Sequence, residues 1–400
     1  MRVLVTSSRM PFALDEIRKL GRQGHYVVAS DTFRTAPGSH TRHAAARVTA
    51  SPRFDRPQFL ADVNRIAEKD RIDLLLPAFE EVFYLAWHAD ELAPRMELFF
   101  PRFETLRRLH DKSALVELAE SLGIPTPRTL VVESQDDLRA AVKELDRYFA
   151  RACFSRGGVS LLTNEGPLAS QLAIEDCHPT PENPWLVQEF VDGEDLCTFS
   201  VVHHGKISAH SAYVHPRELE HAGGIVFESV VDPASLGMIR AMVDAVGYHG
   251  QTSFDFRVGP KGPVLIECNP RPTAGVFVMT PEMLDEAIFA PGPSTRVAPA
   301  GVRHKYSMAL VRDMLLHWSE AREDLMHLFS AAKDVYAERG DFLPAIYQIL
   351  SYSHVAAFKW QKRRGERRPN DLAAGYFHDV LYDGEALGER KGDTLEARAS

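Results

Sequence analysis

The sequence predicts an α/β protein that opens with a doubly wound parallel sheet and continues into an α+β region. Over the first hundred residues, short apolar strands alternate with helices of a length that suits parallel β-α-β units. Further along, residues 253–271 read as two strands joined by a tight turn, with acidic side chains on one face. At 400 residues the chain has room for two or three domains.

The first domain is expected over residues 1–105. Ser7-Ser-Arg-Met-Pro-Phe follows the first strand in place of GxGxxG, so no dinucleotide site is expected in that turn. The predicted strands and helices, which follow the spacing of apolar side chains, are strands at 3–6, 25–30 and 72–77 and helices at 12–20 and 59–67.

Two acids, Glu80 and Glu81, come just after the strand at 72–77. The carboxyl end of a strand in such a sheet faces a ligand crevice. Glu80 is therefore a candidate to bind a substrate amine. Both acids can instead complement the dipole of a helix that follows, and this alternative is favoured for Glu81.

The middle of the chain mixes helices with hairpins. Helices are predicted at 110–123 and 138–145, and a strand at 128–132. A Ser-Arg-Gly-Gly turn at Ser155–Gly158 joins two later strands. The backbone N–H groups of such a turn can surround phosphate oxygens. Hairpins also use two glycines for geometry alone, so the turn by itself leaves both interpretations open.

The acidic hairpin has a predicted register. We expect Pro260-Lys261-Gly262 to form a three-residue loop, which sets Asp255 directly opposite Glu267. Alternation by two then places three polar side chains on one face: Asp255, Glu267 and Asn269. The other face is expected to carry Phe254, Phe256, Val264, Ile266 and Cys268.

Facing carboxylates repel each other unless a positive charge lies between them. Two carboxylates and an amide oxygen are hard ligands that suit Mg²⁺. Arg271, two residues beyond Asn269, is placed to bind a phosphate or a developing negative charge. The alternative is an ordinary acidic hairpin edge with a surface arginine.

Composition excludes some classes of protein. A net charge of −9 argues against general nucleic-acid binding, which needs a basic surface. Four scattered cysteines without metal spacing suggest a reducing compartment. The start of the chain has no signal-peptide pattern, and no apolar run approaches the roughly 18 residues that span a bilayer. A cytoplasmic location is expected.

Beyond residue 290 the composition changes. A linker is predicted at 291–301, then two or three helices from Tyr306 to about Lys362, and a disordered polar tail after Ala386. Lys359–Arg368 is strongly basic and follows an apolar helical stretch. It indicates either binding to an anionic membrane or lipid-linked substrate, or a helix that packs on the body of the protein. The second interpretation is favoured.

Together these pieces resemble the ATP-grasp superfamily, in particular its carboxylate–amine ligases and carbamoyl-phosphate-synthase-like relatives. The resemblance covers roughly residues 1–290, and its strongest element is Asp255 followed by Glu267-Cys-Asn269-Pro-Arg271. It implies a pre-ATP-grasp domain at 1–105 and an ATP-grasp domain at 106–290. The ATP-grasp domain would have two α+β subdomains that clamp ATP. One of them, the lid subdomain, would cover about 128–192. A helical region at 291–385 and a tail at 386–400 would follow.

The resemblance also implies roles for single residues. Asp255, Glu267 and Asn269 would hold one or two Mg²⁺ ions, with Mn²⁺ as an alternative, and Arg271 would stabilise the transferred phosphoryl group. The other implied nucleotide-binding residues are Lys112 at the phosphates, Ser155, Arg156, Gly157 and Gly158 in the lid, Gln188, Glu189 and Val191 at the adenine, and Glu194 at the ribose.

One residue departs from the family pattern. The second phosphate lysine of the family falls at Arg151, which keeps the charge but is larger. Thr273 and Gly275 lie in the segment that often borders the acceptor substrate in the family. The implied activity is ATP-dependent formation of a C–N bond between small molecules, and a homodimer is a reasonable expectation. A thiol or hydroxyl acceptor, or an inactive ATP sensor, remain alternatives.

Overall fold

The structure is a computed structural model in which the chain divides into two compact units. One unit is Met1–Arg107 with Asp341–Ser400, and the other is Arg108–Gly340. The structure describes residues 1–92, 94, 96–155, 161–166, 168–169, 172–218, 223–362 and 375–388. Within residues 356–362 it describes only the backbone.

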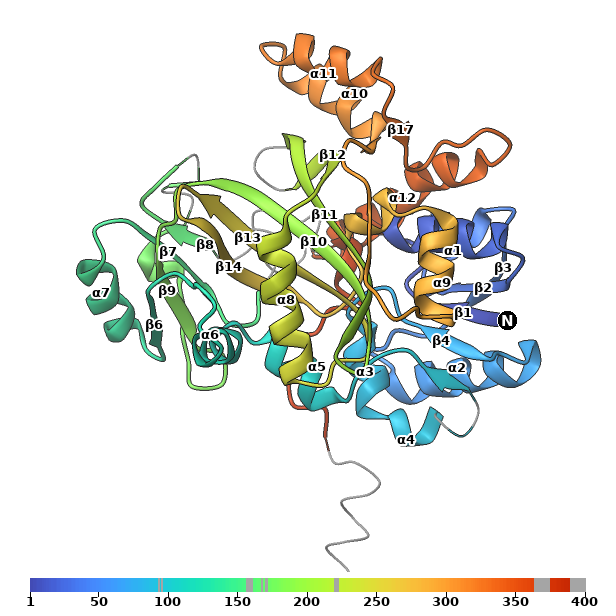
Figure 1. The fold of residues 1–400 in the computed structure, drawn as a ribbon, viewed down its shortest axis with the longest axis horizontal. Coiled ribbons are helices and arrows are strands. Elements are labelled where there is room, and N and C mark those ends of the chain that lie inside the picture. The colour runs from blue at the N-terminus through green and yellow to red at the C-terminus, as the bar shows by residue number, and fades with distance from the viewer. Residues whose placement is uncertain are drawn as a thin grey trace, which may run out of the picture. The chain divides into compact units, whose positions relative to one another are not determined.

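The first unit contains a five-stranded sheet whose pairs are all parallel, in the order β3-β2-β1-β4-β5. This confirms the predicted parallel sheet, and α1 and α2 lie on opposite sides of it (Figure 1). Proline at the start of α1 suits a first helical turn, which needs no N–H donor there. The strands are β1 (Arg2–Val5), β2 (Tyr26–Asp31), β3 (Ala44–Val48), β4 (Leu74–Leu76) and β5 (Glu97–Leu98). The helices are α1 (Pro11–Arg22), η1 (Pro37–His40), α2 (Arg56–Asp70), α3 (Glu81–Trp87), α4 (Ala89–Leu92), α5 (Phe103–His110) and α12 (Leu343–Lys362).

Buried ion pairs join the end of the chain to this sheet. Arg9, which is fully buried, donates to Asp31 Oδ1 and to Asp379 Oδ1, both at 2.8 Å. Arg18 donates to Asp341 Oδ2 at 2.7 Å. The predicted helical region at 291–385 is therefore not one body, because its second half belongs to the N-terminal unit. Of the predicted disordered tail, residues 389–400 lie outside the described part of the chain.

The second unit begins with a four-stranded antiparallel sheet in the order β6-β9-β7-β8. Its residues fall within the expected subdomain of about 128–192. α7 (Gln135–Glu144) packs on one face through Leu138 and Ala141, which contact Ala150 and Val187 in a shared core (Figure 1). The strands are β6 (Thr129–Val132), β7 (Tyr148–Ala152), β8 (Leu161–Thr163) and β9 (Trp185–Glu189).

An eight-stranded sheet follows, in the order β14-β13-β10-β11-β12-β16-β17, with β15 beside β11. Apolar side chains of α6 and α8 pack against Phe254 and Phe256 on one face. The strands are β10 (Glu194–His203), β11 (Lys206–Glu218), β12 (Gly224–Val230), β13 (Gly250–Gly259), β14 (Gly262–Asn269), β15 (Arg296–Val297), β16 (Arg303–Lys305) and β17 (Lys333–Asp334). The helices are α6 (Lys112–Ser121), η2 (Ile174–Asp176), α8 (Pro233–Ala245), η3 (Ala274–Val278), α9 (Pro281–Phe289), α10 (Ser307–Leu316) and α11 (Ala321–Leu328).

Two predictions for the part of the chain after residue 290 can be compared with the structure. The predicted linker at 291–301 contains β15, which pairs in parallel with β11 through Ala209 and His210. The helices predicted between 306 and 362 are present as α10, α11 and α12. Within the described ranges, no helix has the length and apolar character needed to cross a membrane.

Candidate active site

The hairpin of β13 and β14 turns more tightly than predicted. Gly259 pairs with Gly262, so the loop has only Pro260 and Lys261. Gly262 has a φ of 101°, in the region that favours glycine. The predicted three-residue loop is therefore wrong by one residue.

A β-bulge restores the predicted opposition of the acids. The register shifts between Asp255 and Phe256, so that Phe256 pairs with Leu265 while Asp255 pairs with Glu267. Ile266 is the additional residue. Leu265, rather than Val264 or Ile266, joins the core with Phe254, Phe256 and Cys268, which corrects the predicted apolar face. Ile266 lines a cavity instead, as bulges near binding sites often re-aim a side chain.

Asn269 holds the two carboxylates together. Its Nδ2 donates to Asp255 Oδ2 at 3.0 Å and to Glu267 Oε1 at 3.3 Å. Burial, and then the charge of Glu267, raise the pKa of Asp255 to about 7. Burial acts to raise the pKa of Glu267 as well, but Arg151 and Lys112 outweigh it and lower that pKa to about 2. Glu267 is therefore the more readily ionised member of the pair.

These side chains fit a magnesium ion. Carboxylate and amide oxygens are its preferred protein ligands, and the raised pKa of Asp255 indicates that the pair needs more positive charge. Asn269 Oδ1 accepts from Arg271 Nη2 at 3.0 Å, so ligation by this oxygen requires the amide to rotate. Among the described residues no three His, Cys, Asp or Glu form a metal-binding group, so an ion here would need ligands from a nucleotide or water.

The side chain of Lys112 contacts the segment that leads from β7 into the Ser155–Gly158 turn. It is buried, and its Nζ donates to the carbonyl oxygens of Cys153 at 3.3 Å and Ser155 at 2.7 Å. Ser155 Oγ donates to Ala152 O at 2.7 Å, which closes the start of the turn. The other predicted lid residues, Arg156, Gly157 and Gly158, lie outside the described residues.

Arg151 joins the two sheets of this unit. Its Nη1 donates to Glu267 Oε2 at 2.7 Å, and its Nη2 donates to Ile266 O at 2.8 Å. Strand alternation explains its direction, because Ala150 and Ala152 on either side of it point into the core beneath α7. Phe149, two residues before Arg151, therefore faces the same way.

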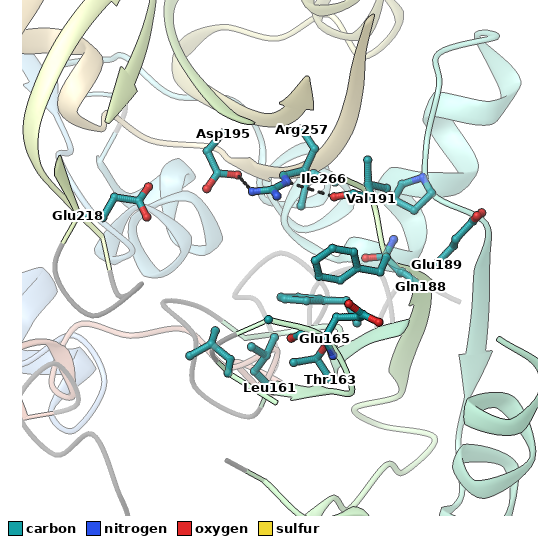
Figure 2. Close-up of a pocket in the computed structure, with 15 residues that line it drawn as sticks. Leu161, Thr163, Glu165, Gln188, Glu189, Val191, Asp195, Glu218, Arg257 and Ile266 are labelled. Carbon is teal, nitrogen blue, oxygen red and sulfur yellow. Dashed lines mark hydrogen bonds and ion pairs between the residues drawn. The ribbon is translucent and has the colours of Figure 1, made fainter. Parts of the chain in front are cut away.

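A cavity of about 360 Å³ opens beside this arginine, and both sheets line it. Phe149, Leu161, Phe190 and Ile266 supply an apolar surface, as is usual for a pocket that binds a small molecule. Figure 2 shows the polar residues at its margin, among them Glu165, Gln188 and Arg257. The full lining is Pro127, Phe149, Leu161, Thr163, Glu165, Gly166, Leu168, Gln188, Glu189, Phe190, Val191, Asp195, Glu218, Arg257 and Ile266.

Three of the four residues predicted along the nucleotide-binding strand line this cavity, namely Gln188, Glu189 and Val191. Gln188 is buried and donates from Nε2 to Thr129 Oγ1 at 3.0 Å. Glu194 is exposed and is absent from the lining, whereas its neighbour Asp195 is present. The predicted role of Glu194 at a ribose stays a prediction, and Asp195 is the acid at the start of β10 that lines the cavity.

Two arginines hold the linker between β9 and β10. Arg257 donates from Nε to Val191 O at 3.4 Å and from Nη1 to Asp195 Oδ1 at 2.7 Å (Figure 2). On the side of the smaller sheet, Arg147 donates to Asp192 Oδ2 at 2.6 Å and lies 4.8 Å from the centre of the Phe190 ring. The linker is therefore fixed to both sheets.

The structure of the chain is similar to solved structures, although the chain matches no protein-family model and no curated protein. Its structure is similar to that of N5-carboxyaminoimidazole synthetase from Staphylococcus aureus complexed with ADP, with a TM-score of 0.60, 12% identity, and coverage of 80% of this chain and 86% of that chain. This chain has the ATP-grasp fold.

Other solved structures with the same ATP-grasp fold are similarly distant in sequence. Phosphoribosylamine–glycine ligase from Thermotoga maritima matches with a TM-score of 0.59 and 17% identity over 76% of this chain and 78% of that chain. L-amino acid ligase from Bacillus licheniformis matches with a TM-score of 0.54 and 14% identity over 72% and 74%. At these identities the comparisons establish the fold.

A chain of hydroxyl groups follows the carboxylate strands and ends at the backbone of Arg271. Tyr213 OH donates to Thr273 Oγ1 at 3.1 Å, Thr273 Oγ1 donates to Ser253 Oγ at 2.9 Å, and Ser253 Oγ donates to Arg271 O at 3.0 Å. Thr273 is thus linked through Ser253 to the backbone of Arg271. The role of this segment in binding an acceptor stays a prediction.

Gly275 and Glu80 are both in close contact with neighbouring residues of the protein. A Cβ at Gly275 would lie 2.5 Å from Phe199 Cβ and 2.8 Å from Ser211 Oγ, so the close packing of η3 on the sheet requires glycine there. Glu80, in the other unit, is fully buried and accepts a hydrogen bond from Tyr382 N at 3.0 Å. A substrate contact by Gly275 or Glu80 stays a prediction. The protein contacts described above do not favour it.

The sequence prediction omits several residues of the cavity lining, chiefly Phe149 and Arg257. Strand alternation was sufficient to find both. Phe149 lies two residues before Arg151, and Arg257 lies two residues after Asp255, so each shares the face of a predicted site residue. Ile266 was not recoverable in this way, because its direction depends on the bulge.

Proposed function

We propose that this chain is an ATP-dependent ligase that activates a carboxylate as an acyl phosphate and joins it to an amine, with release of ADP and phosphate. The observation that carries this proposal is the facing pair of Asp255 and Glu267 beside the cavity lined by both sheets. The solved structures with this fold include an L-amino acid ligase and a synthetase complexed with ADP, which supports ATP as the co-substrate.

In this mechanism the protein mainly positions anions and offsets their repulsion. Mg²⁺ held by Asp255, Glu267 and Asn269 would neutralise charge on the ATP phosphates. Lys112 and Arg151, both next to the β7 end of the cleft, would hold the phosphates from the smaller sheet. Arg271 would release the Asn269 amide and stabilise the transferred phosphoryl group.

A second candidate is an ATP-binding protein without turnover. The ion pair between Arg151 and Glu267 favours it, because one metal ligand is already neutralised by a side chain. Within the enzymatic proposal, a thiol or hydroxyl acceptor is the alternative to an amine. The nucleophile depends on the acceptor pocket rather than on the phosphoryl-transfer residues.

Release of ADP with Mg²⁺ and pooled carboxylates and amines tests the proposal. A ligase produces ADP only when both a carboxylate and an acceptor are present. Formation of a hydroxamate together with ADP and phosphate, when hydroxylamine replaces the amine, would indicate an acyl phosphate. Tight ATP binding without turnover in every pool would contradict the ligase and support the second candidate.

A further inference from the structure

A second cavity lies between the end of β11 and the helices α10 and α11. Its volume is about 320 Å³, which is enough for a small molecule. The described lining, which we call the β11 cavity, consists of residues 215–218 of β11 and of four side chains between residues 313 and 323. Only Pro216 among them is not ionisable. A ligand of this cavity would therefore be selected by its charge.

Arg217, in the wall of the β11 cavity, is surrounded by carboxylates. It donates from Nε to Asp324 Oδ1 at 2.8 Å, and from Nη2 to Asp313 and Glu320. Asp313 and Asp324 are almost completely buried. An anionic ligand that approached Arg217 would meet these three carboxylates and be repelled. The arginine thus does not make this cavity an anion site.

Acids are in excess around the β11 cavity. Among the described residues that line it or contact Arg217, the positive groups are at most that arginine and two histidines, His215 and His317. The acids are Glu218, Asp313, Glu320, Glu323 and Asp324. They stay in excess even when both histidines carry a proton.

One buried carboxylate oxygen of this cluster lacks a partner. Within the part of the chain that the structure describes, nothing donates a hydrogen bond to Asp324 Oδ2. A buried polar atom of this kind is costly unless a cation or a water molecule reaches it. Together with the excess of acids, this atom indicates that the cluster needs additional positive charge.

The negative charge is spread along the β11 cavity. Among the described residues, no three His, Cys, Asp or Glu converge to form a metal-binding group. Glu320 and Glu323 have half-exposed side chains, whereas Asp313 is buried. A single metal ion needs several oxygen ligands around one point. An elongated organic cation with two positive groups fits the arrangement better.

Glu218 connects the β11 cavity with the candidate active site. It lines both this cavity and the cavity of Figure 2, where it lies on the opposite side from Glu189. The ring of His215 lies 5.5 Å from the ring of Tyr213, whose OH donates to Thr273 Oγ1 at 3.1 Å. The wall of the β11 cavity therefore contacts the hydroxyl chain that ends at the backbone of the hairpin.

We propose that the β11 cavity binds an elongated organic cation, and that this cation is the amine substrate of the ligase, held by its second positive group. The assignment as a substrate rests on the proposed function, whereas the binding site rests on charge and shape. The free amine nitrogen of the substrate would attack the acyl phosphate and form the C–N bond. The C–O bond to phosphate would break with its electron pair on phosphate, and the nitrogen would lose a proton to solvent.

Calorimetry of the full-length chain without ATP tests the binding site. The probe is agmatine, which carries a guanidinium group and an ammonium group. Its control is 4-guanidinobutanoate, in which a carboxylate replaces the ammonium group. We expect agmatine to bind at least about 100-fold more tightly than the control, and about tenfold more weakly in 0.5 M than in 0.05 M NaCl. Equal binding of the two compounds, or no binding of agmatine, would overturn the proposal.

Glu320→Gln with Glu323→Gln removes two half-exposed carboxylates from the cavity while Arg217 keeps two other partners. Agmatine should bind about tenfold more weakly to this variant. The matched control is Glu117→Gln with Glu120→Gln on α6, which changes two exposed acids at the same spacing and should bind agmatine like the parent chain. Equal weakening in the two variants would show that only the overall charge matters, and would overturn the site.

ADP release tests the assignment as a substrate. With ATP, Mg²⁺ and pooled carboxylates, we expect turnover with agmatine, putrescine or spermidine as the amine and little turnover with butylamine. Glu320→Gln with Glu323→Gln should raise the KM for the active amine about tenfold. Equal turnover with butylamine would overturn the substrate assignment and leave the ligase standing. If no pool releases ADP but the two-residue variant still loses agmatine binding, the ligase is contradicted and the cation site stands.

Discussion

Arg151 of the four-stranded sheet donates a 2.7 Å hydrogen bond to Glu267 of the eight-stranded sheet. With the hydrogen bond from Arg151 to Ile266 O, this contact joins β7, which lines the cavity through Phe149, to β14, which carries Glu267 of the carboxylate pair. Any cation that binds Glu267 has to share it with this guanidinium. In the proposed ligase, nucleotide, metal and protein charges would meet at this ion pair.

Replacement of Glu267 by Gln tests the role of the carboxylate pair. The side chain keeps its size but loses the charge that would hold the metal, so we expect ADP release to fall at least about 100-fold. Thermal unfolding should remain cooperative, because the core side chains of this hairpin are unchanged. Activity equal to that of the parent chain would contradict the assignment of the metal ligands.

Two substitutions at Arg151 separate charge from shape. Arg151→Gln should weaken ADP binding about tenfold, or ~1.4 kcal/mol, while adenosine binding stays the same, since only ADP carries phosphates. Arg151→Lys keeps the charge and should bind ADP nearly as well. Titration calorimetry with both ligands measures the difference. Equal weakening of ADP and adenosine would show that Arg151 shapes the cavity rather than contacting phosphate.

Arg257 is expected to position the linker that lines the cavity. Arg257→Ala removes the hydrogen bond to Val191 O, worth ~1 kcal/mol, and should raise the KM for ATP about fivefold with kcat unchanged. Arg147→Ala is the control on the other side of the linker. Its ion pairs are exposed, so a change of less than about twofold is expected. A larger effect at Arg147 would contradict this account.

Gly275 and Gly237 form a matched pair for stability. Gly275→Ala forces a Cβ against Phe199 and Ser211 and should lower the free energy of unfolding by about 1–3 kcal/mol. Gly237 lies in α8, and no atom lies within 4 Å of the position that a Cβ would take there, so Gly237→Ala should raise it by about 0.5–1 kcal/mol. Urea unfolding measures both, and destabilisation of similar size in the two variants would argue against close packing at Gly275.

The pair of Arg9 and Asp379 should make stability depend on pH. Burial acts to raise the pKa of Asp379, but Arg9 outweighs it and lowers that pKa. The unfolded chain then binds more protons than the folded one. The stabilisation is complete above the ordinary aspartate pKa of about 3.9 and is lost as the pH falls through the lowered value.

Asp379→Asn removes this dependence. The variant should lose about 1.5–3 kcal/mol at neutral pH, and its urea midpoint should fall less than that of the parent chain between about pH 6 and about pH 3. Asp383→Asn, in a more exposed ion pair with Arg53, is the control and should keep the parent's slope. Parallel slopes for the parent chain and Asp379→Asn would contradict the prediction.

The hairpin of β13 and β14 shows which features a local sequence pattern can predict. Alternation correctly put Asp255, Glu267 and Asn269 together, because side-chain direction in a strand depends only on position. The loop length was wrong, and a bulge at Ile266 compensated for that error. Leu265 and Ile266 are both apolar, so nothing local distinguishes which of them enters the core.

The sequence by itself determined the parallel sheet, the acidic hairpin and the order of the site residues, since these follow from short-range periodicity and residue chemistry. Tertiary structure alone decided three things: the pairing of Arg151 with Glu267, the exposure of Ile346 and Ile349 on α12, and the return of the chain end to the first sheet. Arg9 and Asp379 are separated by 370 positions. Contacts over such distances depend on the packing of whole elements, which no local pattern encodes.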